Sequence, residues 1–281
     1  MANDTTSVPC ANPLVEALTH AVAVLPNGSL DGNFDPGGPF GAGVVVSDLA
    51  WGAFGVAVVP PTPEVPASIV VGLFRPAGRE NLAAARFLMD GSLDRSFGVD
   101  GVARADHSGL ATTDMVRDVD GTLLVTGIYG SMDPTGLMQI GIARFRVDGA
   151  LDTGFGDSGV TVTDAGYRGA RAFAGAVDAG GRPLVAGRVE ETEHFAFAVL
   201  RFTTTGRLDA TFGRNGVVTT SFKQPATGHV INRNAAVTAP PENFPAGDAN
   251  AVAVRPDGTV VATGTVLDQT GSALALARYL P

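Results

Sequence analysis

A short segment built around a Leu-Asp pair recurs along the chain and constrains its fold more than any other feature. The copies read NGSLDGNF at 27–34, DGSLDRSFG at 90–98, DGALDTGFG at 148–156 and TGRLDATFG at 205–213. An arginine upstream recurs in the same way, and the arginines are Arg86, Arg144, Arg201 and Arg278. The spacing of about sixty residues indicates a repeat architecture.

Four short apolar runs lie within each period, and turns rich in Gly, Asp or Pro separate them. In the second period the runs cover 102–105, 115–119, 123–128 and 140–145. Runs of this length and pattern predict β-strands, and the motifs VDGT, AGGR and RPDGT between successive runs predict tight hairpins. Four antiparallel strands per repeat predict one blade of a β-propeller. A solenoid or an immunoglobulin-like array is the alternative, but the unit is too short and lacks the expected core Trp and Cys.

We therefore expect an all-β fold, a β-propeller of four antiparallel four-stranded blades, with the N- and C-terminal strands near the ring closure. The expected single domain covers 14–281, after a disordered or extended segment 1–13. Its repeat units are expected at about 31–93, 94–151, 152–208 and 209–281. Ala21–Leu25 and the C-terminal run ALALARYLP align with the same outer strand. One of them is expected to staple the termini together or to pair with another subunit in a homo-oligomer.

The Leu-Asp segment itself predicts a structural turn between the outer strand of one blade and the inner strand of the next. Gly91 permits a positive φ, Asp94 can accept backbone N–H groups, and Leu93 and Phe97 can fill the gap between blades. A calcium site is the alternative, because Asp-rich loops bind hard cations. Two of the other copies replace the first aspartate, Asp90, by Asn27 or Thr205, which favours the turn.

The segments FLMDGSLDRSFGVDGVARAD and DANAVAVRPDGTVVATG resemble the delta-60 repeat of bacterial proteins, a β-propeller-type repeat. The resemblance covers nearly the whole chain after about Pro13. The first copy departs from the pattern, because it lacks the Gly after Phe34 and contains Pro36 and Pro39. The resemblance implies the repeat fold and implies no activity.

The charge and cysteine content of the chain limit its partners and cross-links. The formal net charge is −9, Lys223 is the sole lysine and no basic run occurs, so we expect no nucleic-acid partner and no membrane association. Cys10 is the sole cysteine, which excludes an internal disulfide. The polar start predicts neither a signal peptide nor a membrane span. We expect a cytoplasmic protein as the sequence stands, or a secreted or envelope protein if a signal was removed.

Candidate site residues lie in the loops that follow the first run of each repeat unit, which repeat symmetry brings to one face of the ring. The loop of the fourth unit, 222–250, is longest, and loops on a rigid scaffold often carry function. Arg168 or Arg233 could clamp a carboxylate or phosphate, and His107 or His229 could transfer a proton near neutral pH. The candidate ligand-binding residues are Trp51, Tyr167, Arg168, Arg171, Asn232 and Arg233, and the candidate catalytic residues are His107 and His229.

Simpler roles compete with these assignments. His107 can be a solvated loop histidine, Trp51 can fill an irregular first blade, and Tyr167 with Arg168 can cap a blade. His194 could join two other histidines in a zinc site, but nothing fixes their spacing, so we expect no metal. GxSxG, HExxH, GxxxxGK[ST] and CxxC motifs are all absent from the sequence, and we expect no cofactor.

Three functions remain open from the sequence. The first is a scaffold that binds a small polar or anionic ligand at the channel mouth. The second is an enzyme, a lyase, cyclase or hydrolase, that uses His, Arg and Tyr residues of the same loops. The third is a structural or protein-interaction repeat protein. The long insertion in one unit favours a site over a plain scaffold, since it breaks the repeat symmetry.

Overall fold

The computed structural model describes residues 19–39, 41–47, 49, 52–63, 65–74, 81–105, 107, 109–130, 138–191, 195–220, 247–268 and 271–280. Within these residues the chain forms seventeen β-strands and no helix. All strand pairs are antiparallel and fall into five sheets. The expectation of an all-β, propeller-type fold with four-stranded antiparallel blades is confirmed.

The sheets follow one another in chain order. The N-terminal pair consists of β1 (Thr19–Val22) and β2 (Val44–Ser47). Blade 1 consists of β3 (Gly52–Val59), β4 (Ser68–Phe74), β5 (Ala83–Leu88) and β6 (Val102–Arg104). Blade 2 consists of β7 (Leu110–Arg117), β8 (Leu123–Tyr129), β9 (Gln139–Phe145) and β10 (Val160–Thr163).

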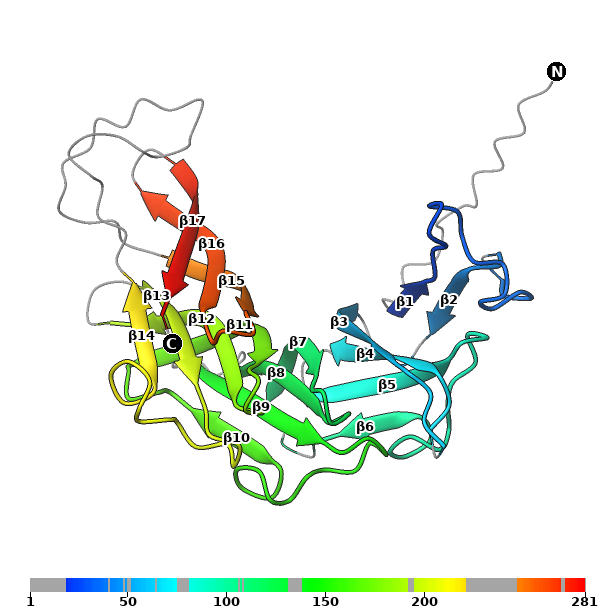
Figure 1. Cartoon of the computed structure of the whole chain (residues 1–281), viewed down its shortest axis with the longest axis horizontal. Coiled ribbons are helices and arrows are strands. Elements are labelled where there is room, and N and C mark those ends of the chain that lie inside the picture. Colours follow the sequence, from blue (N-terminus) through cyan, green and yellow to red (C-terminus); the bar gives the residue numbers. More distant parts are fainter. Residues whose placement is uncertain are drawn as a thin grey trace.

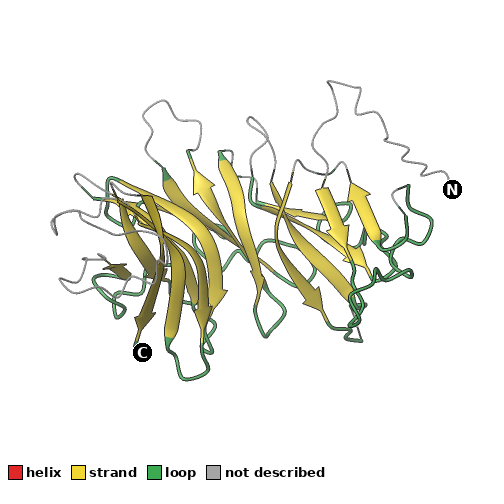
Figure 2. Ribbon diagram, turned by 90° about the horizontal axis from the view of Figure 1, so that it is seen from above, coloured by secondary structure: helices red, strands yellow, loops and turns green. Residues whose placement is uncertain are grey.

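Blade 3 and the C-terminal sheet complete the series. Blade 3 consists of β11 (Gly169–Val177), β12 (Pro183–Glu190), β13 (Phe195–Arg201) and β14 (Val217–Thr220). The C-terminal sheet has three strands, which are β15 (Gly247–Val254), β16 (Val260–Asp268) and β17 (Gly271–Tyr279). The five sheets lie along an open arc, with the N-terminal pair at one end and the C-terminal sheet at the other (Figures 1 and 2). The described strands do not close into a ring.

The Leu-Asp segment connects two strands of the same sheet, so the prediction that it joins successive blades was wrong. In blade 1 the segment follows β5, and the chain then returns along β5 as β6, with Ala85 opposite Val102. The same arrangement links β9 to β10 and β13 to β14. Each blade therefore takes its outer strand from the beginning of the following repeat unit. The apolar pattern locates the strands but does not show which neighbour each one pairs with.

The hydrophobic core lies between neighbouring sheets, because the sheets in the middle of the arc are apolar on both faces. Phe97 is fully buried in a cluster that contains Leu82 of blade 1 and Met115 of blade 2. Similar clusters join the N-terminal pair to blade 1, blade 2 to blade 3, and blade 3 to the C-terminal sheet. The predicted gap-filling role of Phe97 is thereby confirmed.

The Leu-Asp segments hold successive blades together through their arginines. The Nε group of Arg86 donates to Asp94 Oδ2 at 2.8 Å, and its Nη1 group donates to the carbonyl oxygen of Val147 in the next blade. The same guanidinium lies 4.7 Å from the centre of the Phe97 ring. Asp94 Oδ1 accepts the N–H of Ser96 at 3.0 Å, which confirms its role as a turn acceptor. The contacts combine a charged hydrogen bond, a turn and a cation–π contact in one unit.

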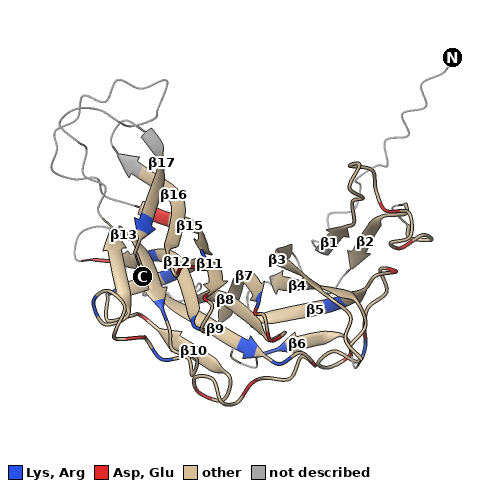
Figure 3. Ribbon diagram, viewed as in Figure 1, with Lys and Arg blue, Asp and Glu red and all other residues tan. Residues whose placement is uncertain are grey.

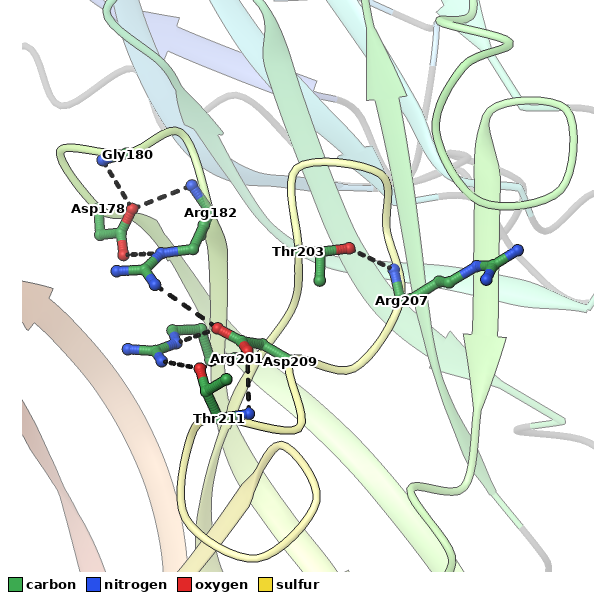
Figure 4. A network of polar contacts seen from close by, with 8 residues as sticks. All are labelled: Asp178, Gly180, Arg182, Arg201, Thr203, Arg207, Asp209 and Thr211. Carbon is green, nitrogen blue, oxygen red and sulfur yellow. Dashed lines mark hydrogen bonds and ion pairs between the residues drawn. The ribbon is translucent and has the colours of Figure 1, made fainter.

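Blade 3 repeats this unit and extends it (Figure 4). Asp209 accepts from Arg201 Nε at 2.8 Å and from the Thr211 hydroxyl at 2.6 Å. Arg182 joins the group from the hairpin between β11 and β12, with its Nη1 atom 3.6 Å from Asp209. It also donates to Asp178 at 2.7 Å. The network therefore links the Leu-Asp segment between β13 and β14 to the hairpin between β11 and β12 of the same blade.

A glycine on the second strand of the blade is required by a bulge on the first strand. The β11–β12 register shifts between Ala172 and Ala174, and Gly187 faces the irregularity. A Cβ atom on Gly187 would overlap the carbonyl oxygen of Arg171. Gly127 and Gly264 meet the same obstacle opposite the bulges of β7 and β15. The bulge turns the end of each inner strand and so sets the direction of the side chains beside it.

Candidate functional site

A cluster of charged residues lies where β11, β12 and β15 come together, at the end of blade 3 that carries the β10–β11 loop. Figure 3 shows positive and negative residues together in this region. Arg171 on β11 and Arg188 on β12 are direct cross-strand partners. Arg188 Nη1 donates to Asp248 Oδ1 at 3.0 Å, and Asp248 belongs to the C-terminal sheet. The cluster therefore spans the boundary between two sheets.

Two aromatic rings hold Arg188 in place. Its guanidinium carbon lies 4.2 Å from the ring centre of Phe195 and 5.8 Å from that of Phe173. Phe173 is the bulged residue of β11, so the bulge brings the ring toward the arginine. The Nε atom of Arg188 is buried and has no hydrogen-bond partner among the described residues. Within the part of the chain that the structure describes, stacking and the Asp248 carboxylate thus fix this guanidinium without using all of its donors.

Arg171 differs from Arg188 in its contacts with carboxylates. Burial lowers the pKa of Arg171, and the nearby charge of Arg188 lowers it further, whereas Asp248 and Glu190 act in the opposite direction. Within the described part of the chain, no carboxylate lies within ion-pair distance of Arg171. Among the described residues, two guanidinium groups therefore lie side by side and one of them, Arg188, has a carboxylate within ion-pair distance. Such a pair attracts a carboxylate or a phosphate.

Tyr167 and Arg168 lie beside this cluster in the β10–β11 loop. The Nε atom of Arg168 is 3.8 Å from Glu190 Oε1, and the backbone N–H of Arg168 donates to the Glu190 carbonyl at 3.3 Å. Both residues line an open depression of about 720 Å³, together with Glu190, Glu191 and Arg214. A narrow crevice between Gly169, Arg171, Arg188 and Phe195 also reaches Glu190. Glu190 thus borders both the depression and the crevice.

His107 lies on a different blade. Its ring meets the ring of Tyr129 edge to face, with centroids 5.4 Å apart and planes at 86°. Its backbone N–H donates to the Ala105 carbonyl at 2.7 Å. These contacts place His107 against β8 of blade 2, whereas Arg171 belongs to blade 3. Tyr167, Arg168 and Arg171 all come from the β10–β11 loop and β11, and no contact joins them to His107, so the prediction that loop residues of several blades share one site stays a prediction.

The remaining predicted residues lie outside the described part of the chain. They are Trp51, His229, Asn232 and Arg233. Sequence reasoning missed Arg188 and Asp248, because it considered loops and these residues lie on strands. The signal for Arg188 was available, since VAGRVE places one arginine inside an otherwise apolar run. A charged residue at such a position must find a partner when the strand is buried.

Asp114 is a half-buried aspartate on β7, the first strand of blade 2. Its Oδ2 atom accepts the N–H of Gly175 in blade 3 at 2.9 Å, and its Oδ1 atom accepts the N–H of Met115 at 2.8 Å. Burial raises the pKa of Asp114, and these two hydrogen bonds only partly oppose the effect. Asp114 therefore links two blades through a carboxylate that is held in an unfavourable environment.

The described residues contain neither a metal-binding cluster nor a membrane-spanning helix. No group of three or more His, Cys, Asp or Glu side chains is arranged to hold a metal ion among them. In the same part of the chain, no helix has the length and apolar character needed to cross a membrane.

Comparison with known proteins gives one partial match. The family model described as "Domain of unknown function (DUF5122) beta-propeller" matches residues 69–97, which cover most of β4, β5 and the Leu-Asp segment of blade 1. The match supports a β-propeller-type repeat family. No curated protein matches the chain.

Proposed function

We propose that this chain is a β-propeller scaffold that binds a small anionic ligand at the Arg171–Arg188 pair. The observation that carries the proposal is the adjacency of two guanidinium groups of which, among the described residues, Arg188 alone has a carboxylate within ion-pair distance. A ligand carboxylate or phosphate that approaches Arg171 would accept paired N–H groups and relieve the repulsion between the arginines.

The surroundings favour a ligand with both an anionic and a polar part. The crevice beside Arg171 encloses only about 10 Å³, so the anionic group would lie at its outer edge and the rest of the ligand would extend into the depression lined by Tyr167 and Arg168. Glu190 and Glu191 line the same depression, so a ligand with hydroxyl or amine donors on that side fits better than a fully anionic one. Blade 3 and the C-terminal sheet together provide the rigid support.

Isothermal titration calorimetry with inorganic phosphate and with succinate tests the proposal. We expect one site on the wild-type chain, an affinity at least about 10-fold lower for Arg171→Gln, and a smaller loss for Arg168→Gln. Arg146→Gln is the matched control, because Arg146 is an exposed arginine paired with Asp148 near the opposite end of the strands. Equal affinity of the wild type and Arg171→Gln, or no binding of either anion, would refute the proposed site.

An enzymatic role is the second candidate, and it would require a proton-transfer group near the bound anion. Tyr167 is the described residue that could serve, since it lines the depression next to Arg168. His107 is held against Tyr129 on blade 2, and this favours a structural contact for it. Binding is therefore the function that the described residues support best, ahead of catalysis and of a purely structural role.

A further inference from the structure

The C-terminal sheet presents an apolar face that its counterpart in blade 3 buries. Within the described residues its order is β15-β16-β17, so β17 has one neighbour and no outer strand. The repeat aligns Arg278 with Arg201, which makes Leu274 the counterpart of Phe197 and Leu276 the counterpart of Val199. Phe197 and Val199 are fully buried against the next sheet, whereas Leu274 is 82% and Leu276 67% exposed. The C-terminal sheet thus has the face of an inner blade without the sheet that should cover it.

The other end of the arc shows the complementary deficiency. The N-terminal pair contains only the counterparts of the third and fourth strands of a blade, and its inner two strands are missing from the described structure. Val56 on β3 of blade 1 is therefore 67% exposed, whereas its counterpart Met115 on β7 is packed between blades 1 and 2. Val58 on the same strand is equally exposed.

The Arg–Asp unit is divided between the two ends. Asp31 belongs to a Leu-Asp segment that has Ala23 where the other segments have the arginine, because the N–H of Asp31 donates to the Ala23 carbonyl as the N–H of Asp94 donates to that of Arg86. Arg278 has the position of the arginine and is exposed. Among the described residues, neither Asp31 nor Arg278 forms an ion pair of the kind that joins Arg86 to Asp94. The N-terminal end of the arc therefore has the aspartate of such a pair, and the C-terminal end has the arginine.

We propose that two copies of this chain close one ring, in which β17 of each copy replaces β1 beside β2 of the other. The completed blade has the order β15-β16-β17-β2 and places Arg278 of one copy against Asp31 and Phe34 of its partner copy. Each chain then accounts for four blades and the ring for about eight, within the range of known propellers. The two interfaces are related by a twofold axis, so the assembly ends at a dimer.

The exchange is favourable because β17 is the better third strand. Among the described strands, β1 covers four residues and pairs with β2 alone, whereas β17 covers nine and is already paired with β16. At the position where β1 presents Ala21 to blade 1, β17 presents Leu276. Replacement therefore buries a larger apolar side chain and adds two inner strands that cover Val56 and Val58.

A second copy fits better than closure within one chain. The two ends stand apart across the opening of the arc (Figure 1). The packed clusters between successive sheets set the curvature of the arc, and a tighter single-chain ring would have to rearrange every one of them. A partner copy joins the ends and leaves these clusters unchanged.

Light scattering after size-exclusion chromatography is the first test. We expect twice the chain mass of 28.6 kDa for the wild type. Leu276→Asp should raise the dimer dissociation constant by roughly 100-fold, because it places a charge in the centre of each interface. Val119→Asp is the control, since Val119 is another exposed apolar residue, at the β7–β8 hairpin, and should leave the mass unchanged. A wild-type chain that is monomeric at all concentrations would overturn the proposal.

Cysteine cross-linking tests the strand register and distinguishes the two kinds of closure. The repeat register places Leu274 opposite Ser47, as Phe197 is opposite Thr220 in blade 3. In a Cys10→Ser background, Leu274→Cys with Ser47→Cys should give covalent dimers on mild oxidation, whereas Leu276→Cys with Ser47→Cys should react more slowly because the pair is two residues out of register. Cross-linking within a single chain, or equal rates for the two pairs, would refute closure by a second copy.

Discussion

The three Arg–Asp pairs of the Leu-Asp segments share one geometry and differ in burial. The side chains of Arg86 and Asp94 are 4% and 8% exposed, whereas those of Arg144 and Asp152 are 20% and 25% exposed. Hydrogen bonds from Ser96 and the charge of Arg86 outweigh the effect of burial and hold the pKa of Asp94 below its usual value. The stabilisation that each pair provides should therefore follow its burial.

Removal of the arginine from the most buried pair should cost the most. Arg86→Met leaves Asp94 as a buried carboxylate without its cation, so we expect a loss of about 3 kcal/mol in the free energy of unfolding. Arg144→Met should cost roughly half as much, because water can solvate Asp152. Arg146→Met should change the stability by less than about 0.5 kcal/mol, since both side chains of its ion pair with Asp148 are exposed. Urea denaturation measures all three, and equal losses would contradict the role of burial.

The pKa of Asp114 is shifted upward, whereas that of Asp94 is shifted downward. Burial raises this pKa in the folded chain, so the folded state binds the proton more tightly than the unfolded state. The resulting stabilisation is complete below the unfolded pKa and is lost as the pH rises through the folded value. Asp114→Asn carries no charge, and its stability relative to the wild type should therefore increase from acidic to neutral pH.

Asp257 provides the matched comparison for this pH dependence. Hydrogen bonds from Thr259 lower its pKa in an exposed hairpin, so its stabilisation is present above the unfolded pKa and is lost as the pH falls. The stability of Asp257→Asn relative to the wild type should change in the direction opposite to that of Asp114→Asn. Denaturation curves for both variants between pH 3 and pH 7 decide the point, and a flat difference for Asp114→Asn would show that its carboxylate is solvated.

At the scale of the strand, the sequence predicts where the strands lie but does not predict which strands pair with each other. Apolar runs and turn motifs located the strands, and Gly91 and Asp94 have the predicted turn roles. The bulges on the first strands could not be predicted, although the glycines opposite them, such as Gly187, were visible in the sequence. Alternation along a strand shows which faces are apolar, but several neighbours can satisfy the same pattern.

For the candidate site as well, the sequence indicates residues near loops but not their partners on other sheets. Tyr167, Arg168 and Arg171 were predicted because they lie in or near a loop, and their role in binding stays a prediction. Arg188 was missed because its partner Asp248 is sixty residues away in the sequence and belongs to another sheet. Pairing across a sheet boundary depends on the order of the sheets, which the repeat pattern alone does not determine.

At the scale of the whole molecule, each sheet packs only against its neighbours along the arc. Blades 2 and 3 are covered on both faces, whereas the C-terminal sheet is covered on one. In arrays of this kind, local stability depends on the neighbours that each unit has, so the ends of an open arc should unfold more readily than its middle. The amide groups of β17 therefore report directly on whether the ring is closed.

Hydrogen exchange should show this difference between the closed and open forms. In Leu276→Asp, where we expect the open arc, amides of β17 and β1 should exchange faster than those of β8 and β12. In the wild type above the dimer dissociation constant, β17 should gain protection to the level of β13, because it acquires β2 of the partner copy as a second neighbour. The amides of β1 should stay unprotected, since the exchange displaces that strand. Protection of β1 together with rapid exchange in β17 at every protein concentration would mean that the arc is the final state of the chain.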